Sequence, residues 1–123
     1  MTTILFGYKK CSTCKKAEKF FKDRNKPFDY IDITEKPPSK KQLKQFIKIS
    51  ELPIKKWFNS SGLVYREMNL KSKLDDMSEA QMLELLASNG KLIKRPVVSG
   101  NSSNGQPNIT VGFKQDQFEA IWD

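Results

Sequence analysis

The sequence predicts an α/β fold: a four-stranded mixed β-sheet flanked by helices, with a helical insert between the second and third strands. Three observations support this prediction. The first third of the chain carries strand, helix and strand patterns, the middle carries helical patterns, and the last third carries two strands and a helix. A strand–helix–strand unit places its strands parallel and a hairpin places them antiparallel, so the sheet is mixed.

The first strand–helix–strand unit covers about thirty residues. Residues 1–6 form an apolar run that ends at Gly7, which is typical of a buried strand. From Ser12 the apolar residues follow a helical spacing as far as the polar stretch at residues 23–26. Residues 28–33 alternate apolar and polar side chains, which predicts the second strand.

The insert covers residues 36–89 and contains several helices. Ser39 and Ser78 each precede a glutamine by three residues, and both patterns match the capping box that begins a helix. Residues 54–58 predict one further helical turn between them. We expect Asn89-Gly90 to supply the C-terminal stop of the last helix of the insert.

The last third of the chain completes the sheet. Residues 92–98 lead into the third strand, residues 100–107 form a polar loop, and residues 109–113 predict a fourth strand antiparallel to the third. Asp116, which has a glutamate three residues later, is expected to cap a final helix.

These elements predict a single domain over residues 1–123, with a core from residues 1–35 and 90–123 and the insert from residues 36–89. A chain of 123 residues is long enough to bury a hydrophobic core. No apolar run reaches the length of a membrane span, and no secretory leader precedes the first strand. We therefore expect a cytoplasmic protein with no membrane partner.

The net charge of +8 raises the question of an anionic partner. The lysines are spread along helix faces, with few arginines or exposed aromatic residues between them, so we interpret the excess mainly as solvated surface and expect no direct DNA binding. The chain has no histidine, which excludes Ser–His and Cys–His catalysis.

The chain has two cysteines, Cys11 and Cys14, at the predicted turn from the first strand into the first helix. Unpaired backbone N–H groups and the positive end of the helix dipole favour a thiolate there, as do the nearby lysines Lys10 and Lys15. We therefore expect Cys11 to be a nucleophile. Cys14 lies one helical turn further on, where it can attack a mixed disulfide formed at Cys11.

Other interpretations of the cysteine pair are weaker or remain open. A zinc site needs further ligands, and the chain offers no other cysteine and no histidine, so we expect no metal. A tyrosine-phosphatase loop needs arginine at position 17, which is Ala17. A structural disulfide is disfavoured because the link is short. The alternative that stays open is that Cys14 only packs in the core and Cys11 acts alone.

Four stretches together resemble the arsenate reductase-like (ArsC/Spx/MgsR) family of the thioredoxin-fold superfamily, which also contains the Spx-type transcriptional regulators. They are Cys11-Ser12-Thr13-Cys14, Lys36-Pro37-Pro38-Ser39, Leu92-Ile93-Lys94-Arg95-Pro96-Val97 and Val111-Gly112-Phe113. The resemblance covers essentially the whole chain and implies a thioredoxin-like fold.

The resemblance also implies roles for single residues. It implies that Pro96 follows a cis peptide bond beside the active cysteine, and that Arg95 faces this cysteine to bind an oxyanion or stabilise the thiolate. Ser12 and Thr13 of the cysteine turn, with Arg95 and Pro96, would then contact the substrate. Cys11, Cys14 and Arg95 form the implied catalytic set.

Two departures from the family pattern argue against arsenate reduction. The glutaredoxin-dependent arsenate reductases hold the oxyanion with three arginines, and only Arg95 has a counterpart here. The other two positions fall near Asn59 and Phe113, which are not basic. Cys14, conversely, matches the cysteine pair of the Spx-type regulators, although the chain ends at Asp123 without the longer tail of those regulators.

We therefore expect a thiol–disulfide redox protein in which Cys11 attacks a disulfide and Cys14 resolves the product. No bound cofactor is expected, and glutathione, a glutaredoxin or a thioredoxin would restore the reduced pair. One alternative is a redox-sensing transcriptional regulator that binds RNA polymerase. The other is a single-thiol, glutathione-dependent arsenate reductase that uses Cys11 alone.

Overall fold

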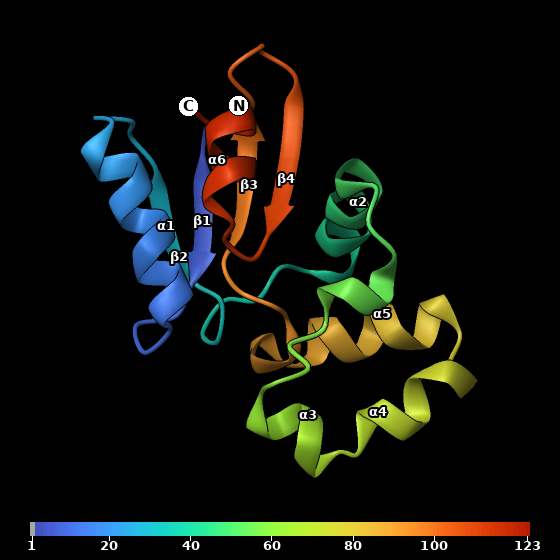
Figure 1. Ribbon diagram of the computed structural model, residues 1–123. Helices are drawn as coiled ribbons and strands as arrows, with labels where there is room; N and C mark the ends of the chain where they lie inside the picture. The colour runs from blue at the N-terminus through green and yellow to red at the C-terminus, as the bar shows by residue number, and fades with distance from the viewer. Residues whose placement is uncertain (1) are drawn as a thin grey trace. The chain divides into compact units, whose positions relative to one another are not determined.

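The computed structural model describes residues 2–123, which form two compact units of about 60 residues each (Figure 1). The first unit combines the chain up to Asp32 with Arg95–Asp123, and the second unit is Ile33–Lys94. The predicted insert, residues 36–89, lies within the second unit. Met1, which the predicted first strand included, lies outside the described residues. That the two units form one cooperative domain stays a prediction.

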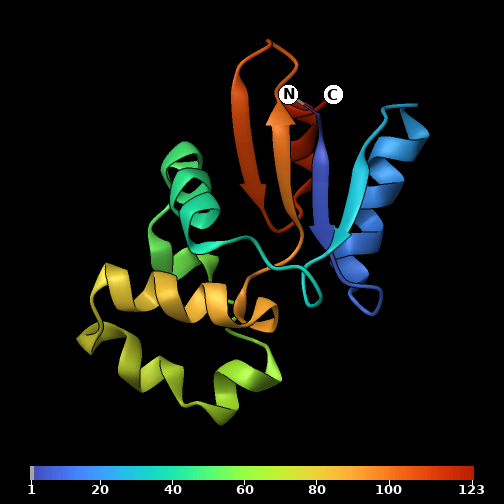
Figure 2. The same ribbon diagram turned by 180° about the vertical axis from the view of Figure 1, so that it is seen from behind.

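The first unit contains a four-stranded mixed sheet, as predicted. Its strands, in chain order, are β1 (Ile4–Gly7), β2 (Asp29–Asp32), β3 (Val97–Asn101) and β4 (Pro107–Val111). The spatial order is β2-β1-β3-β4, seen from both sides in Figures 1 and 2. β1 runs parallel to β2 and antiparallel to β3, and β4 runs antiparallel to β3. Leu5 pairs with Tyr30 on one side and with Val98 on the other.

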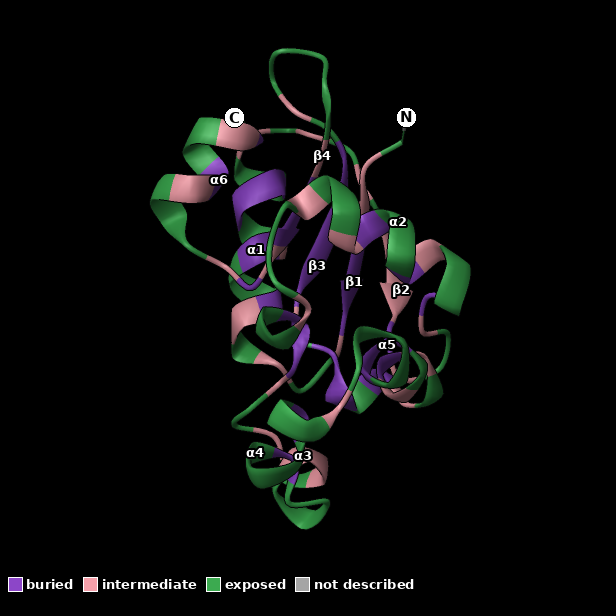
Figure 3. Ribbon diagram, turned by 90° about the vertical axis from the view of Figure 1, so that its right-hand side faces the viewer, coloured by how far each residue is buried: buried purple, intermediate pink, exposed green. Residues whose placement is uncertain are grey.

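Helices α1 (Ser12–Asp23) and α6 (Gln115–Ile121) cover one face of this sheet (Figures 1 and 2). Strands β1 and β3 are the most deeply buried, as Figure 3 shows, because each has a neighbour on both sides. The buried side chains between sheet and helices form one cluster, which comprises Leu5, Ala17, Phe20, Phe21, Val98, Phe118 and Trp122. The apolar spacing of α1 thus places its buried side on the sheet.

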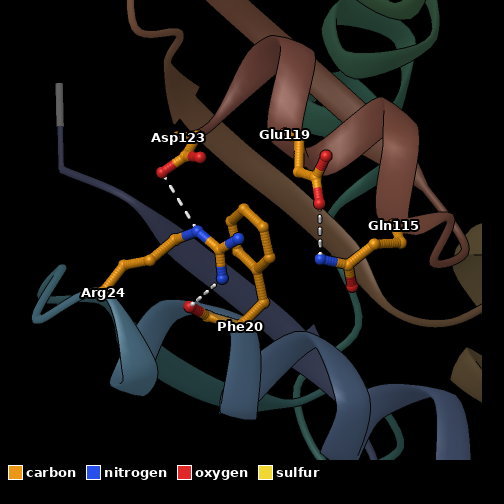
Figure 4. Close-up of polar contacts among 5 residues, drawn as sticks. All are labelled: Phe20, Arg24, Gln115, Glu119 and Asp123. Atoms are coloured by element: carbon orange, nitrogen blue, oxygen red, sulfur yellow. Dashed lines mark hydrogen bonds and ion pairs between the residues drawn. The ribbon is translucent and has the colours of Figure 1, made fainter.

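Polar contacts join the end of α1 to the end of the chain (Figure 4). The Arg24 Nε–H donates to Asp123 Oδ1 at 3.0 Å, and Nη1–H donates to the Phe20 carbonyl at 3.4 Å. The Arg24 guanidinium also lies 3.7 Å from the centre of the Phe20 ring. Because Arg24 is half-buried, it closes the edge of the aromatic cluster while its charge remains paired.

The predicted cap of the last helix is wrong. Lys114 occupies the N-cap position, without a side-chain capping bond, and Asp116 lies inside the first turn of α6. Asp116 still places a negative charge near the positive end of the helix. The predicted partner Glu119 instead accepts a hydrogen bond from Gln115 along the helix (Figure 4).

The second unit is helical throughout, as predicted. Its elements are α2 (Lys40–Ser50), η1 (Ile54–Trp57), α3 (Leu63–Glu67), α4 (Leu70–Lys73), η2 (Leu74–Asp76), α5 (Glu79–Ser88) and η3 (Gly90–Leu92), where η marks a 3-10 helix. Ser78 forms the predicted capping box at α5, and Ser39 accepts the backbone N–H of Gln42 at the start of α2. Phe58, directly after η1, and Ile93, directly after η3, form an isolated antiparallel bridge within this unit.

The predicted helix stop at Asn89-Gly90 is confirmed, because α5 ends at Ser88 and Asn89 is its C-cap residue. Gly90 itself begins η3 and is not in the left-handed region, so this glycine is needed for a further reason. A side chain at this position would place its Cβ 1.8 Å from the carbonyl oxygen of Ile33. Glycine therefore allows two backbone segments to meet closely.

The end of β3 also differs from the prediction. The predicted polar loop begins at Gly100, but Gly100 and Asn101 belong to β3. A Cβ at Gly100 would lie 2.9 Å from Thr3 Oγ1, so this glycine packs against the start of the chain. Among the described residues no helix is long and apolar enough to cross a membrane.

Candidate functional site

Cys11 is the N-cap residue of α1, as the sequence predicts. Its backbone is extended, with φ −95° and ψ 114°. The Cys11 N–H donates to the Tyr8 carbonyl at 3.0 Å, which closes the turn between β1 and α1. The Lys15 N–H donates to the Cys11 carbonyl at 3.2 Å, which is the first hydrogen bond of the helix. The half-buried sulfur therefore faces the free N–H groups of the first turn.

Two groups of the first turn form hydrogen bonds with the Cys11 sulfur. The Cys14 N–H donates to Cys11 Sγ at 3.4 Å, and Thr13 Oγ1 lies at hydrogen-bond distance, 3.0 Å, from the same sulfur. Partial burial alone raises the pKa of Cys11. Hydrogen bonds from Cys14 and Thr13, together with the charge of Arg95, outweigh it and lower the pKa below its ordinary value. The site thus favours the thiolate at Cys11.

Cys14 has the opposite character. Its side chain is fully buried on the side of α1 that faces the sheet. Burial, followed by the hydrogen bond and the charge of Cys11, raises its pKa to about 12. Both cysteines are free thiols, and residues 2–123 contain no group of side chains that could hold a metal. The pair therefore combines one thiol whose ionisation is favoured with a second whose ionisation is opposed.

Arg95 and Pro96 belong to the same unit as the cysteine pair. The peptide bond between them is cis, as the resemblance implied. The Arg95 guanidinium carbon lies 5.2 Å from the centre of the Tyr8 ring, and its charge lowers the pKa of Cys11. Pro96 is buried, and its carbonyl accepts the Gly112 N–H at 2.8 Å. Arg95 is thereby held close to the turn that carries Cys11.

The remaining predicted positions differ in their surroundings. Ser12 is exposed at the start of α1, next to Thr13, whose hydroxyl is hydrogen-bonded to the Cys11 sulfur. Phe113 is half-buried and packs its ring edge-on against Phe118, with 4.7 Å between ring centres. Asn59 belongs to the second unit, where its N–H donates to the Leu92 carbonyl. Neither Phe113 nor Asn59 supplies a positive charge.

Tyr30 is a residue near the thiols that the sequence analysis did not single out. A Cβ at Gly7 would lie 3.3 Å from the Tyr30 hydroxyl, so this hydroxyl lies over the end of β1. Burial, and then electrostatic repulsion by Cys14 as it ionises and by Glu18, raise the pKa of Tyr30 to about 12. The alternation of apolar and polar residues in β2 indicates the face of the sheet on which Tyr30 lies. Its position beside Gly7 follows only from the pairing of β2 with β1.

Comparison with known proteins identifies the family. The family model described as the ArsC family matches residues 6–121, nearly the whole chain. The chain belongs to the ArsC family. Family membership agrees with the free thiol at the N-terminus of α1 and supports a role in thiol redox chemistry.

Individual relatives match this ArsC-family chain over nearly its whole length. It is 49% identical over 122 residues to YusI of Bacillus subtilis (strain 168), which covers 99% of both chains. The crystal structure of an ArsC family related protein from Bacteroides fragilis is 42% identical, with a TM-score of 0.89 over 97% of this chain and 96% of that chain. The global transcriptional regulator Spx of Streptococcus agalactiae serotype V is 22% identical over 95% of this chain and 80% of Spx.

Proposed function

We propose that this protein is a thiol–disulfide oxidoreductase in which Cys11 is the nucleophile and Cys14 the resolving thiol. One observation carries the proposal: the Cys11 sulfur caps α1 and accepts the N–H of Cys14, one turn along the same helix. A thiolate in this position is stabilised without a histidine or a metal. The second thiol is close enough to share a hydrogen bond with it.

The reaction proceeds in two exchanges. The Cys11 thiolate attacks one sulfur of a substrate disulfide, forming a mixed disulfide as the substrate S–S bond breaks and its leaving thiolate takes up a proton. Cys14 then loses its proton and attacks Cys11 Sγ, which releases the second substrate thiol and leaves a Cys11–Cys14 disulfide. The pair has given two electrons, and glutathione, a glutaredoxin or a thioredoxin returns them.

The high pKa of Cys14 is compatible with this order of events. While Cys11 is a thiolate, its hydrogen bond and its charge hold the proton on Cys14. Both effects vanish when Cys11 becomes part of a mixed disulfide, so the pKa of Cys14 falls at the step in which Cys14 must attack. Burial still opposes its ionisation, and this makes resolution the slower exchange.

Arg95 is proposed to hold the acidic or oxyanionic part of the substrate beside Cys11, with Ser12, Thr13 and Pro96 lining the same approach. Its guanidinium can form paired hydrogen bonds with an anion, which a lysine cannot. A substitution of Arg95 by lysine therefore weakens substrate attack while it retains the charge that lowers the pKa of Cys11.

The reduction potential of the cysteine pair tests the dithiol mechanism. The protein is equilibrated in glutathione buffers, free thiols are alkylated, and the products are weighed by mass spectrometry. We expect an intramolecular disulfide with a potential near the cytosolic value of about −220 to −320 mV. Cys14→Ala should accumulate a Cys11–glutathione adduct, and Cys11→Ser should form none. If the unmodified protein yields only this adduct at every buffer ratio, the dithiol mechanism is wrong.

The single-thiol mechanism is the second candidate, because Cys14 is fully buried and its pKa is raised to about 12. In that case Cys14 packs in the core and Cys11 works with external glutathione. Turnover of a glutathione-mixed disulfide would then be the same in Cys14→Ala. We expect neither mechanism to reduce arsenate efficiently, because Arg95 is the single counterpart of the three oxyanion arginines.

The relationship to Spx favours a regulatory variant of the same chemistry. Here the Cys11–Cys14 disulfide would act as a switch for binding RNA polymerase, without direct contact to DNA. Purified polymerase should then be retained by the oxidised immobilised protein and by the reduced form to different extents. Equal retention, or none, would exclude this variant.

A further inference from the structure

A groove in the second unit is lined by residues of α2, η1 and the start of α5. α5 contacts both α2 and η1, and Figures 1 and 2 show where these three elements lie within the unit. Its volume is about 920 Å³, near the upper end of the range of ligand pockets in proteins. Ile47, Ile54 and Leu83 give it an apolar lining, and Leu52, which is 37% exposed, extends this surface at the end of α2. The groove is therefore an apolar surface open to a partner.

One wall of the groove is strongly basic. Four exposed lysines of α2 line it, namely Lys40, Lys41, Lys44 and Lys48. At about 100° per residue, they share about one third of the circumference of the helix, and they extend about 12 Å along its axis. Lys40 lies 3.7 Å from Glu84, and within residues 2–123 the other three lysines form no ion pair. The opposite wall contributes one carboxylate, Glu79.

The charge pattern selects the kind of occupant. A single phosphate or carboxylate would engage one or two of these lysines, whereas charges spread over about 12 Å match several carboxylates in a row. Lys44 and Lys48 are one helical turn apart, about 6 Å, which is also the spacing of carboxylates at positions i and i+4 of a partner helix. An amphipathic acidic helix would place its apolar side on the lining and its carboxylates on α2.

We propose that this groove binds an acidic amphipathic segment of another protein. The complex would be formed by apolar contact with Ile47, Ile54 and Leu83, and oriented by ion pairs with Lys44 and Lys48. Every residue of the groove belongs to the second unit, so the site does not depend on the Cys11–Cys14 chemistry. It gives the helical insert a recognition role.

Fluorescence anisotropy with a defined probe tests the proposal. The probe is a fluorescein-labelled peptide of about five helical turns, with leucines along one side and glutamates flanking them. We expect saturable binding to the full chain at physiological salt, weakened at least about tenfold by the double change Lys44→Glu and Lys48→Glu. The double change Lys71→Glu and Lys73→Glu, on the exposed side of α4, alters the net charge equally and should leave the affinity unchanged.

Further arms of the experiment separate the groove from diffuse attraction. A peptide with serines in place of its leucines should bind more weakly, and Leu52→Ser should weaken the original peptide. Cys11→Ser should bind it normally, which separates this site from the redox site. Absence of binding, equal loss in both lysine pairs, or equal affinity for the serine peptide would overturn the proposal. So would binding to phosphatidylglycerol vesicles in place of the peptide, because a lipid surface would then be the ligand.

Discussion

The pKa of Cys11 depends on hydrogen bonds from single neighbouring groups, and a substitution of Thr13 tests this directly. Thr13→Val keeps the shape of the side chain but removes the hydroxyl that lies 3.0 Å from Cys11 Sγ. Because this hydrogen bond lowers the pKa of Cys11, the variant should show a higher pKa and a several-fold slower alkylation by iodoacetamide near neutral pH. At strongly alkaline pH the two rates should converge. Ser12→Ala, on the exposed neighbouring residue, is the control, and an unchanged pH profile in Thr13→Val would contradict the argument.

Cys14 should make the fold sensitive to alkali. Its pKa rises from 9.0 to about 12 on folding, so the unfolded chain loses this proton first as the pH increases. The stability that protonated Cys14 contributes is complete below pH 9 and is lost as the pH rises towards about 12. The free energy of unfolding should therefore fall more steeply over this range than in Cys14→Ala. Both proteins carry Tyr30→Phe, because the pKa of Tyr30 is also raised, to about 12. Equal slopes of unfolding free energy against pH, with and without Cys14, would contradict this prediction.

At the scale of elements, two glycines with different surroundings should respond differently to alanine. In Gly90→Ala the new Cβ would lie 1.8 Å from the Ile33 carbonyl oxygen, and backbone cannot move aside as a flexible side chain can. We expect a loss of at least about 3 kcal/mol in the free energy of unfolding, measured with urea. Gly105 has φ +85° and no atom within 4 Å of its Cβ position, so Gly105→Ala should lose only about 1–2 kcal/mol. Equal losses would show that the contact at Gly90 relaxes easily.

The same elements show what the sequence could predict. The capping box at Ser78 and the N-cap position of Cys11 are local patterns, which is why both could be inferred from a few adjacent residues. The helix stop at Asn89-Gly90 could be inferred, but the close contact of Gly90 could not, because its neighbour Ile33 is distant along the chain. Tyr30 was missed because its position beside the thiols follows from the register of β1 and β2. Caps formed by adjacent residues can be predicted from the sequence, whereas contacts between residues distant along the chain cannot.

At the scale of the whole molecule, the two tryptophans report separately on the two units. Trp57 is fully buried in the second unit, and its indole N–H donates to Ser50 Oγ at 3.3 Å. Trp122 is 3% exposed in the first unit, and its N–H donates to Thr110 Oγ1 at 3.1 Å. Trp57→Phe therefore leaves a fluorescent probe in the first unit, and Trp122→Phe leaves one in the second.

These variants test whether the units fold together. A unit of about 60 residues buries a smaller share of its surface than a larger domain does and is marginally stable alone. The first unit is also made of two chain segments separated by the whole of the second. We therefore expect a single cooperative transition: in each single-tryptophan variant, urea unfolding followed by fluorescence should coincide with unfolding followed by far-ultraviolet circular dichroism. If the Trp122 signal changes at a different urea concentration from the helical signal of the same variant, the units unfold independently. The prediction of one domain would then be wrong, and the groove of the second unit could open without disturbing the cysteine pair.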